Sequence, residues 1–158
     1  MTEKTCAFTG HRAIPKDETE PLRRRLAETV ERLYREGYRV FLAGGALGFD
    51  RMAADAVLSL RKKYPEIRLH LVLPCDDQER LWRFSERLAY HKQVKQADEV
   101  TVLAERYYDG CMQARNARLI DGADYLVAYV TRTRSGAAQT LRMAERKGIG
   151  ITNLAAGL

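Results

Sequence analysis

Three glycines within five residues stand out first among the residues that could bind a ligand. In "AGGALGFD" (43–50), Gly44, Gly45 and Gly48 follow an apolar run and precede good helix formers. Where a strand ends and a helix begins, unpaired backbone N–H groups and the positive end of the helix dipole face one point, which favours a phosphate or carboxylate. Glycine lets a ligand oxygen approach those N–H groups closely. The segment predicts a phosphate cradle, with a tight turn that binds no ligand as the alternative.

A second turn of this kind is "RTRSGAAQT" (132–140), in which Ser135 and Gly136 open a small-residue helix. The hydroxyls of Ser135 and Thr140 would add donors to the backbone N–H groups. Alternatively, Ser135 only caps the helix and the alanines only pack. Neither turn has the dinucleotide spacing G-x-G-x-x-G, which disfavours NAD-dependent hydride transfer. We expect Gly45→Val to abolish ligand binding and to leave the fold intact.

Polar and charged side chains follow other predicted strands. Gly10, His11 and Arg12 come directly after the first strand, where a guanidinium can form paired hydrogen bonds with phosphate or carboxylate oxygens. Arg115 lies on a short predicted helix that could reach the same crevice. His11 is a candidate catalyst or a structural hydrogen-bonding residue. Asp50 is either a partner of the helix dipole or an acceptor for a ribose hydroxyl.

Alternating strand and helix patterns position these residues. Strand-type runs cover 5–10, 38–45, 67–74, 99–104, 124–130 and 149–154. Helical patterns begin at Pro21 and end at Gly37, and recur over 49–64, 77–97, 110–122 and 136–148, with a possible break near Phe84 and Ser85. Trp82, in the third helical segment, either stacks on a base or packs together with Leu81 and Phe84 against the sheet.

Strands separated by helices of this length imply right-handed crossovers and a sheet covered on both faces. The sequence therefore predicts an α/β fold in one domain over residues 1–158, Rossmann-like, with three layers and a mainly parallel sheet. In such sheets the ligand crevice lies beyond the carboxyl ends of the strands. The order of the strands stays open.

Composition narrows the class of protein further. Apolar residues make up 46% and charged residues 30% of the chain, as in soluble globular proteins, and no window is apolar enough to span a membrane. We expect a cytoplasmic protein with no membrane partner. Cys6, Cys75 and Cys111 lack the spacing of a metal site, predicting buried thiols and no bound metal. The net charge of +6 suits nucleic acid, a small anionic ligand or solubility.

The assembled motifs resemble the SLOG superfamily, which includes the cytokinin-activating LOG phosphoribohydrolases and the DNA-uptake protein DprA, and within it the YpsA-like branch. The resemblance rests on four segments: "FTGHR" (8–12), "AGGALGFDRMAADA" (43–56), "MQARNARLIDGADYLVAY" (112–129) and "SGAAQTLRMAERKGI" (135–149). It implies a Rossmann-type binder of nucleotide-derived ligands, such as a nucleoside phosphate, NAD or an ADP-ribose-like molecule. It also implies a possible homodimer.

Two LOG patterns map onto this chain, and a third departs from it. The pattern GGxxG followed by ADA places Gly44, Gly45, Gly48 and Asp55 on matching positions, and MxxRK places Arg115 on a functional arginine, with Asn116 in place of the lysine. The catalytic glutamate of PGGxGTxxE falls on Met143, whose thioether cannot act as a general base. LOG-type hydrolysis by the same mechanism is therefore disfavoured.

Three functions follow from the residues and the resemblance. The first is a cytosolic binder or sensor of a nucleotide-derived ligand, held by the glycine turns together with Arg12 and Arg115. The second is a nucleotide N-glycosidase or phosphoribohydrolase-like enzyme with a different acid/base set, for which His11, Asp50, Asp109 and Arg115 are candidates. The third is DprA-like binding of single-stranded nucleic acid, which would need exposed aromatics; its candidates are Tyr90, Tyr107 and Tyr108.

Overall fold

Buried strands alternate with amphipathic helices along residues 3–158, the part of the chain that the computed structural model describes. The strands are β1 (Lys4–Gly10), β2 (Tyr38–Ala43), β3 (Arg68–Leu73), β4 (Glu99–Val102), β5 (Tyr125–Tyr129) and β6 (Gly150–Asn153). The helices are the short 3-10 helix η1 (Lys16–Glu18) and α1 (Thr19–Arg35), α2 (Phe49–Lys63), α3 (Phe84–Gln96), α4 (Cys111–Asp121) and α5 (Gly136–Lys147).

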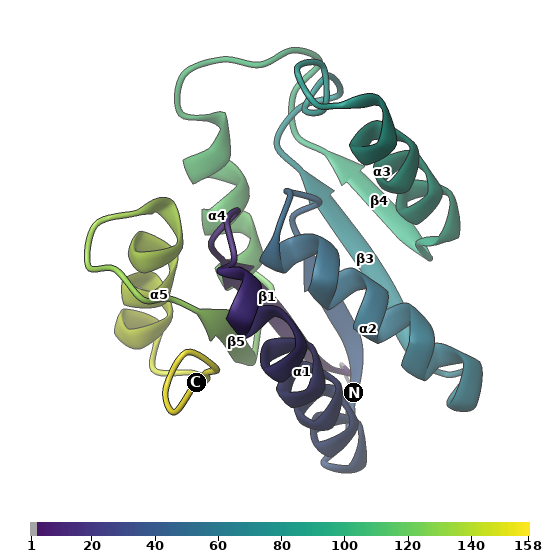
Figure 1. The fold of residues 1–158 in the computed structure, drawn as a ribbon, viewed down its shortest axis with the longest axis vertical. Coiled ribbons are helices and arrows are strands. Elements are labelled where there is room, and N and C mark those ends of the chain that lie inside the picture. Colours follow the sequence, from purple (N-terminus) through teal and green to yellow (C-terminus); the bar gives the residue numbers. More distant parts are fainter. Residues whose placement is uncertain (1–2) are drawn as a thin grey trace.

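The six strands form one parallel sheet in the order β4-β3-β2-β1-β5-β6. From β1 the chain adds strands toward one edge as far as β4, then crosses back to place β5 and β6 on the other side of β1 (Figure 1). The strand order therefore reverses between β1 and β5, which is where open α/β sheets bind ligands. The predicted single-domain, Rossmann-like α/β fold is confirmed, and the sheet is entirely parallel.

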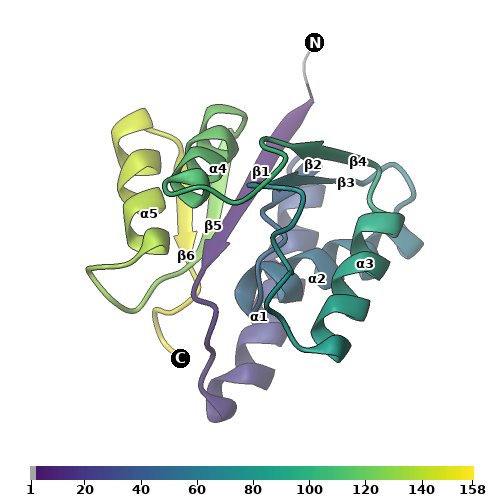
Figure 2. The same cartoon turned by 90° about the horizontal axis from the view of Figure 1, so that it is seen from above.

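Helices cover both faces of this sheet, as the predicted three layers require. Figure 2 shows α1, α2 and α3 on one face and α4 with α5 on the other. Alternate residues of each strand supply the two cores: in β1, Phe8 faces the α1 and α2 side, whereas Ala7 faces the α4 and α5 side. Small residues at the start of α5, Ala137 and Ala138, let that helix lie close to the strands.

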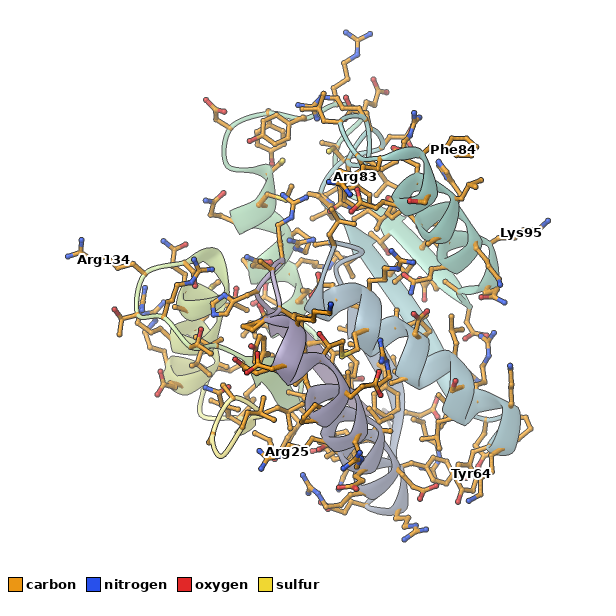
Figure 3. All side chains as sticks on the ribbon, in the orientation of Figure 1. Arg25, Tyr64, Arg83, Phe84, Lys95 and Arg134 are labelled. Carbon is orange, nitrogen blue, oxygen red and sulfur yellow. The ribbon has the colours of Figure 1, made fainter. Side chains whose placement is uncertain are left out.

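One predicted helix is shorter than its sequence pattern. Residues 77–83 form turns, and α3 begins only at Phe84. One long-range and one local contact explain the difference. The Asp77 carboxylate accepts a hydrogen bond from the Tyr107 N–H group, and the Glu86 carboxylate accepts one from Arg83 N, which caps α3. Leu81 and Phe84 do not pack on the sheet; 84% and 76% of their surface is exposed, and Phe84 points outward in Figure 3.

The three cysteines are buried free thiols, as predicted. Among residues 3–158, no helix has both the length and the apolar character needed to cross a bilayer.

Candidate functional site

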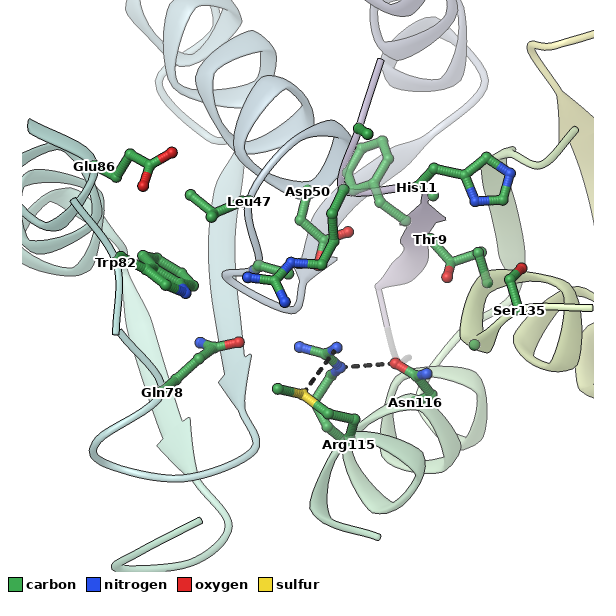
Figure 4. A pocket seen from close by; sticks show the side chains of 18 of the residues that line it. Thr9, His11, Leu47, Asp50, Gln78, Trp82, Glu86, Arg115, Asn116 and Ser135 are labelled. Carbon is green, nitrogen blue, oxygen red and sulfur yellow. Dashed lines mark hydrogen bonds between the residues drawn. The ribbon is translucent and has the colours of Figure 1, made fainter. Parts of the chain in front are cut away.

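A cavity of about 800 Å³ lies beyond the carboxyl ends of β1 and β5. Its walls come from the segment after β1, the start of α2, the turns at 77–83, α4 and the start of α5 (Figure 4). Both sequence-predicted turns therefore border one space. The predicted site residues that line it are Gly10, His11, Arg12, Asp50, Arg115, Ser135 and Gly136. Gly44, Gly45, Gly48 and Thr140 are not among its lining residues, and neither is Asp109.

The start of α5 presents unpaired backbone donors to this cavity. Ser135 caps the helix, because its Oγ accepts a 3.0 Å hydrogen bond from Ala138 N. The N–H groups of Gly136 and Ala137 have no acceptor within residues 3–158, and both residues line the cavity. Thr140 adds no donor here, since its hydroxyl donates to Gly136 O within the same helix. This corner has the features of an anion site.

The other turn already contacts an acidic side chain of the protein itself. The carboxylate of Asp50, a buried residue in the first turn of α2, accepts a 3.3 Å hydrogen bond from Ala46 N. Burial raises the pKa of Asp50, whereas the positive charge of Arg115 and the amides of Ala46 and Gly44 oppose that rise. Two backbone amides of the turn after β2, those of Ala46 and Gly44, therefore stabilise the charged form of Asp50.

The glycines of this turn allow close packing behind the cavity wall. Gly48 has φ +77°, and a Cβ there would lie 2.1 Å from the carbonyl oxygen of Arg12. A Cβ on Gly44 would lie 2.5 Å from Arg115 Nη1. At Gly45, φ is +72° and a Cβ would meet the side chain of Leu73 at 2.6 Å. In Gly45→Val the side chain would adopt an unfavourable φ and press on Leu73, so we expect this variant to lower the stability of the fold as well as ligand binding.

Arg115 connects α4 to that turn. It is only 6% exposed, and its Nη1 donates to Gly44 O at 2.6 Å while its Nε donates to Asn116 Oδ1 at 2.7 Å. Its Nη2 has a single hydrogen-bond partner within residues 3–158, the sulfur of Met112 at 3.8 Å. Burial lowers the pKa of Arg115, and the charge of Asp50 opposes that effect. One end of a buried cation is thus left with a weak acceptor.

His11 connects three elements around the cavity. Its Nε2 accepts a 2.9 Å hydrogen bond from Thr131 N, and its carbonyl oxygen accepts one from Phe49 N. Its Nδ1 lies 3.2 Å from Arg132 Nη2. Burial, helped by the charge of Arg132, lowers the pKa of His11, so the ring is neutral at pH 7. These contacts support the structural alternative for His11, because Nε2 already accepts a backbone N–H group; a catalytic role stays a prediction.

Positive charge dominates the cavity wall. The lining includes five arginines (Arg12, Arg80, Arg83, Arg115, Arg132) and two carboxylates (Asp50, Glu86). Aromatic rings accompany the arginines: Arg12 lies 6.0 Å from the ring centre of Trp82, and Arg80 lies 4.7 Å from that of Tyr107. The wall therefore favours an anionic ligand with a planar group.

Sequence reasoning missed Gln78 in this wall and misjudged Tyr90. Gln78 falls in the segment expected to be helical, where no periodic pattern marks it, and it is only 6% exposed. Tyr90, a candidate for stacking on nucleic-acid bases, is only 5% exposed and packs edge-on against Trp82. Tyr107 and Tyr108 are exposed, as the nucleic-acid hypothesis needs.

No group of three or more potential metal-ligating side chains occurs within residues 3–158.

A parallel sheet with helices on both faces and a cavity where the strand order reverses defines a Rossmann-like α/β protein. The model of the YpsA family, described as the YspA SLOG family, matches residues 8–148, and this chain belongs to that family.

Similar proteins include the SPbeta prophage-derived protein YoqJ of Bacillus subtilis, 28% identical over 79% of this chain and 80% of the relative. A UPF0398 protein of Halalkalibacterium halodurans is 30% identical over 73% of this chain and 62% of its own length. Among solved structures, DprA from Streptococcus pneumoniae aligns with this chain with a TM-score of 0.67 and 17% identity. The alignment covers 94% of this chain and 49% of the DprA chain. DprA from Helicobacter pylori, which has a unique single-stranded DNA binding mode, aligns with a TM-score of 0.65 and 20% identity over 95% of this chain and 64% of the DprA chain. The DprA likeness shows the fold alone.

Proposed function

We propose that this protein binds a nucleotide-derived anionic ligand, such as a nucleoside phosphate, NAD or an ADP-ribose-like molecule, with a phosphate at the start of α5. One observation carries the proposal: the N–H groups of Gly136 and Ala137 are unpaired within residues 3–158 and border the cavity. A helix N-terminus of this kind attracts a phosphate through its free donors and its dipole. Ser135 keeps the donors in place by capping the next N–H group.

Charge and size agree with such a ligand. Arg12 and Arg132 are exposed cations in the wall and are free to contact phosphate oxygens, and charge-assisted hydrogen bonds are about twice as strong as neutral ones. The volume of about 800 Å³ lies within the usual range for small-molecule sites, roughly 300 to 1,000 Å³. We assign Gly44, Gly45 and Gly48 the task of shaping the turn that carries Asp50; direct contact of these glycines with the ligand stays a prediction.

Calorimetric titration and thermal shift with a ligand panel test the proposal. Adenosine monophosphate, ADP-ribose, NAD and ribose 5-phosphate carry phosphate, whereas adenosine is the uncharged control. We expect phosphate-bearing ligands to bind and adenosine to bind far more weakly, because adenosine has no anionic oxygen for the free N–H groups and the helix dipole. If no phosphate-bearing ligand binds or raises the melting temperature, the proposal is wrong.

A hydrolase is the second candidate, supported by Asp50. A buried carboxyl with a raised pKa in a ligand cavity is a common feature of a general acid. Incubation of the protein with nucleotides and ADP-ribose, followed by chromatography, tests for release of base or ribose phosphate. Turnover that is lost in Asp50→Asn would support an enzyme, and intact ligand at high protein concentration would favour a binding protein.

A further inference from the structure

A buried oxygen without a hydrogen-bond partner lies in the wall of this cavity. Gln78 is 6% exposed, and its Oε1 is the one buried side-chain nitrogen or oxygen within residues 3–158 that lacks a partner. Its Nε2 donates to the hydroxyl of Tyr90 at 3.4 Å, so the side chain is held from one side only. Buried polar atoms nearly always have a partner, and an exception in a ligand cavity indicates a missing donor.

Gln78 and Arg115 lie on opposite walls of the cavity. In Figure 4 the amide oxygen of Gln78 is turned toward Arg115, and Trp82 lies beside Gln78. Among the described residues, the Nη2 of Arg115 has one acceptor, the weak acceptor Met112 Sδ at 3.8 Å. An unpaired acceptor and an underused donor therefore face the same end of the cavity. A group that donates and accepts at adjacent atoms would satisfy both.

We propose that the Trp82 end of the cavity recognises an adenine base, with Gln78 Oε1 accepting a hydrogen from its exocyclic amino group; this rests on the proposed function above. Adenine carries its amino group next to ring nitrogens that accept hydrogen bonds, and glutamine pairs with this edge in nucleic-acid recognition. Hypoxanthine and guanine place an oxygen where adenine has the amino group. Facing Gln78 Oε1, that oxygen would repel it and leave it unpaired.

The neighbouring side chains leave a place for the ring. The guanidinium of Arg12 lies 6.0 Å from the ring centre of Trp82, whereas Arg39 stacks directly on Tyr34 at 4.1 Å. Arg12 is exposed at the cavity wall and Trp82 is half-buried, so one can shift while the other stays fixed. A planar base can therefore stack on the indole below the guanidinium, as bases do on aromatic side chains. The phosphate would then extend toward the start of α5.

The fluorescence of Trp82, the single tryptophan of the chain, provides a direct readout of the base. The wild-type protein is titrated with adenosine monophosphate, N6,N6-dimethyladenosine monophosphate, inosine monophosphate and ribose 5-phosphate. The affinities are checked by calorimetry. We expect adenosine monophosphate to change the emission and to bind about tenfold more tightly than the inosine and dimethyl compounds, which offer no N6 hydrogen. Ribose 5-phosphate should bind with little change in emission.

Gln78→Met and Gln93→Met form a matched pair. Both glutamines are buried, but Gln93 donates to Asp55 Oδ1 at 2.7 Å and lies outside this cavity. We expect Gln78→Met to lose the adenine preference while ribose 5-phosphate still binds, and Gln93→Met to keep the preference and melt at a lower temperature. Equal binding of adenosine, inosine and dimethyl compounds by wild type overturns the inference, as does a preference that survives Gln78→Met. Binding of none of the four compounds overturns the proposed function and this inference with it.

Discussion

Arg115 Nη1 donates a 2.6 Å hydrogen bond to the carbonyl oxygen of Gly44, across 71 residues of sequence. The contact joins α4 to the turn after β2. The same guanidinium supplies the positive charge that opposes the burial effect on the pKa of Asp50. Arg115, Gly44 and Asp50 therefore form one unit at the cavity wall, and the geometry of the turn depends on it.

Removal of Arg115 should destabilise the protein strongly. In Arg115→Met, Gly44 O and Asn116 Oδ1 lose their donor and Asp50 stays buried without the opposing charge. We expect the free energy of unfolding, measured in urea, to fall by about 3–5 kcal/mol. Arg118→Met is the matched control on the exposed face of α4, with an expected change within about 0.5 kcal/mol. Equal losses in the two variants would contradict this account.

Alanine substitutions at Gly48 and Gly110 distinguish the cost of a positive φ from the cost of a steric clash. Both have positive φ, +77° and +96°, but a Cβ on Gly48 would meet Arg12 O at 2.1 Å, whereas a Cβ on Gly110 meets nothing within 4 Å. We expect Gly110→Ala to cost about 1 kcal/mol. Gly48→Ala should cost clearly more, since the segment after β1 must move. Thermal unfolding of both variants checks this, and similar melting temperatures would refute the packing role of Gly48.

Substitutions at Gly136 test the phosphate site at a single hydrogen bond. Proline is well tolerated at the first position of a helix and removes its N–H group, and the extended backbone of the preceding Ser135 suits proline. We expect Gly136→Pro to weaken binding of adenosine monophosphate roughly tenfold or more, the loss of one charge-assisted hydrogen bond. Gly136→Ala keeps the N–H group, and its Cβ would lie 3.8 Å from Asn116 Nδ2, an ordinary contact.

Calorimetry of the two Gly136 variants, with circular dichroism to confirm that α5 forms, completes the comparison. The alanine variant should bind as the wild type does. If the proline variant also binds like the wild type, Gly136 N does not contact the ligand.

Stability should fall in mild acid because of His11. The pKa of His11 lies below 6.5 in the folded protein, so the unfolded chain binds a proton more readily. The stabilising contribution is complete above about pH 6.5 and is lost as pH falls through the lower pKa of the folded state. In His11→Gln, whose Oε1 can still accept from Thr131 N, we expect a smaller loss of stability between pH 7.5 and roughly pH 5.5. Urea unfolding at several pH values measures it, with the more exposed His91→Gln as control. Parallel curves for wild type and His11→Gln would exclude His11 as the cause.

Sequence periodicity was sufficient for the architecture, because strand and helix patterns depend on neighbours within a few residues. It located all six strands and the five α-helices. The third helix was predicted to begin at residue 77, seven residues before its observed start at Phe84. The reason is a tertiary contact. The Asp77 carboxylate accepts a hydrogen bond from Tyr107 N, thirty residues away, and this contact holds residues 77–83 in turns. Strand ends such as Gly10 and His11 could be found as candidates, since parallel strands place their carboxyl ends at one edge.

The order of the strands, and with it the cavity, came only from the tertiary structure. Sequence spacing marked the turn at 43–50 as a phosphate cradle, which stays a prediction. In the folded chain the Ala46 amide of that turn donates to Asp50, whereas the N–H groups of Gly136 and Ala137 have no acceptor within residues 3–158. Gln78 carries no local signal at all, because its unpaired oxygen is a property of the groups around it. Sequence determines which residues can donate and accept; the folded chain determines which of them remain unpaired, because hydrogen-bond partners here are set by contacts between residues far apart in sequence.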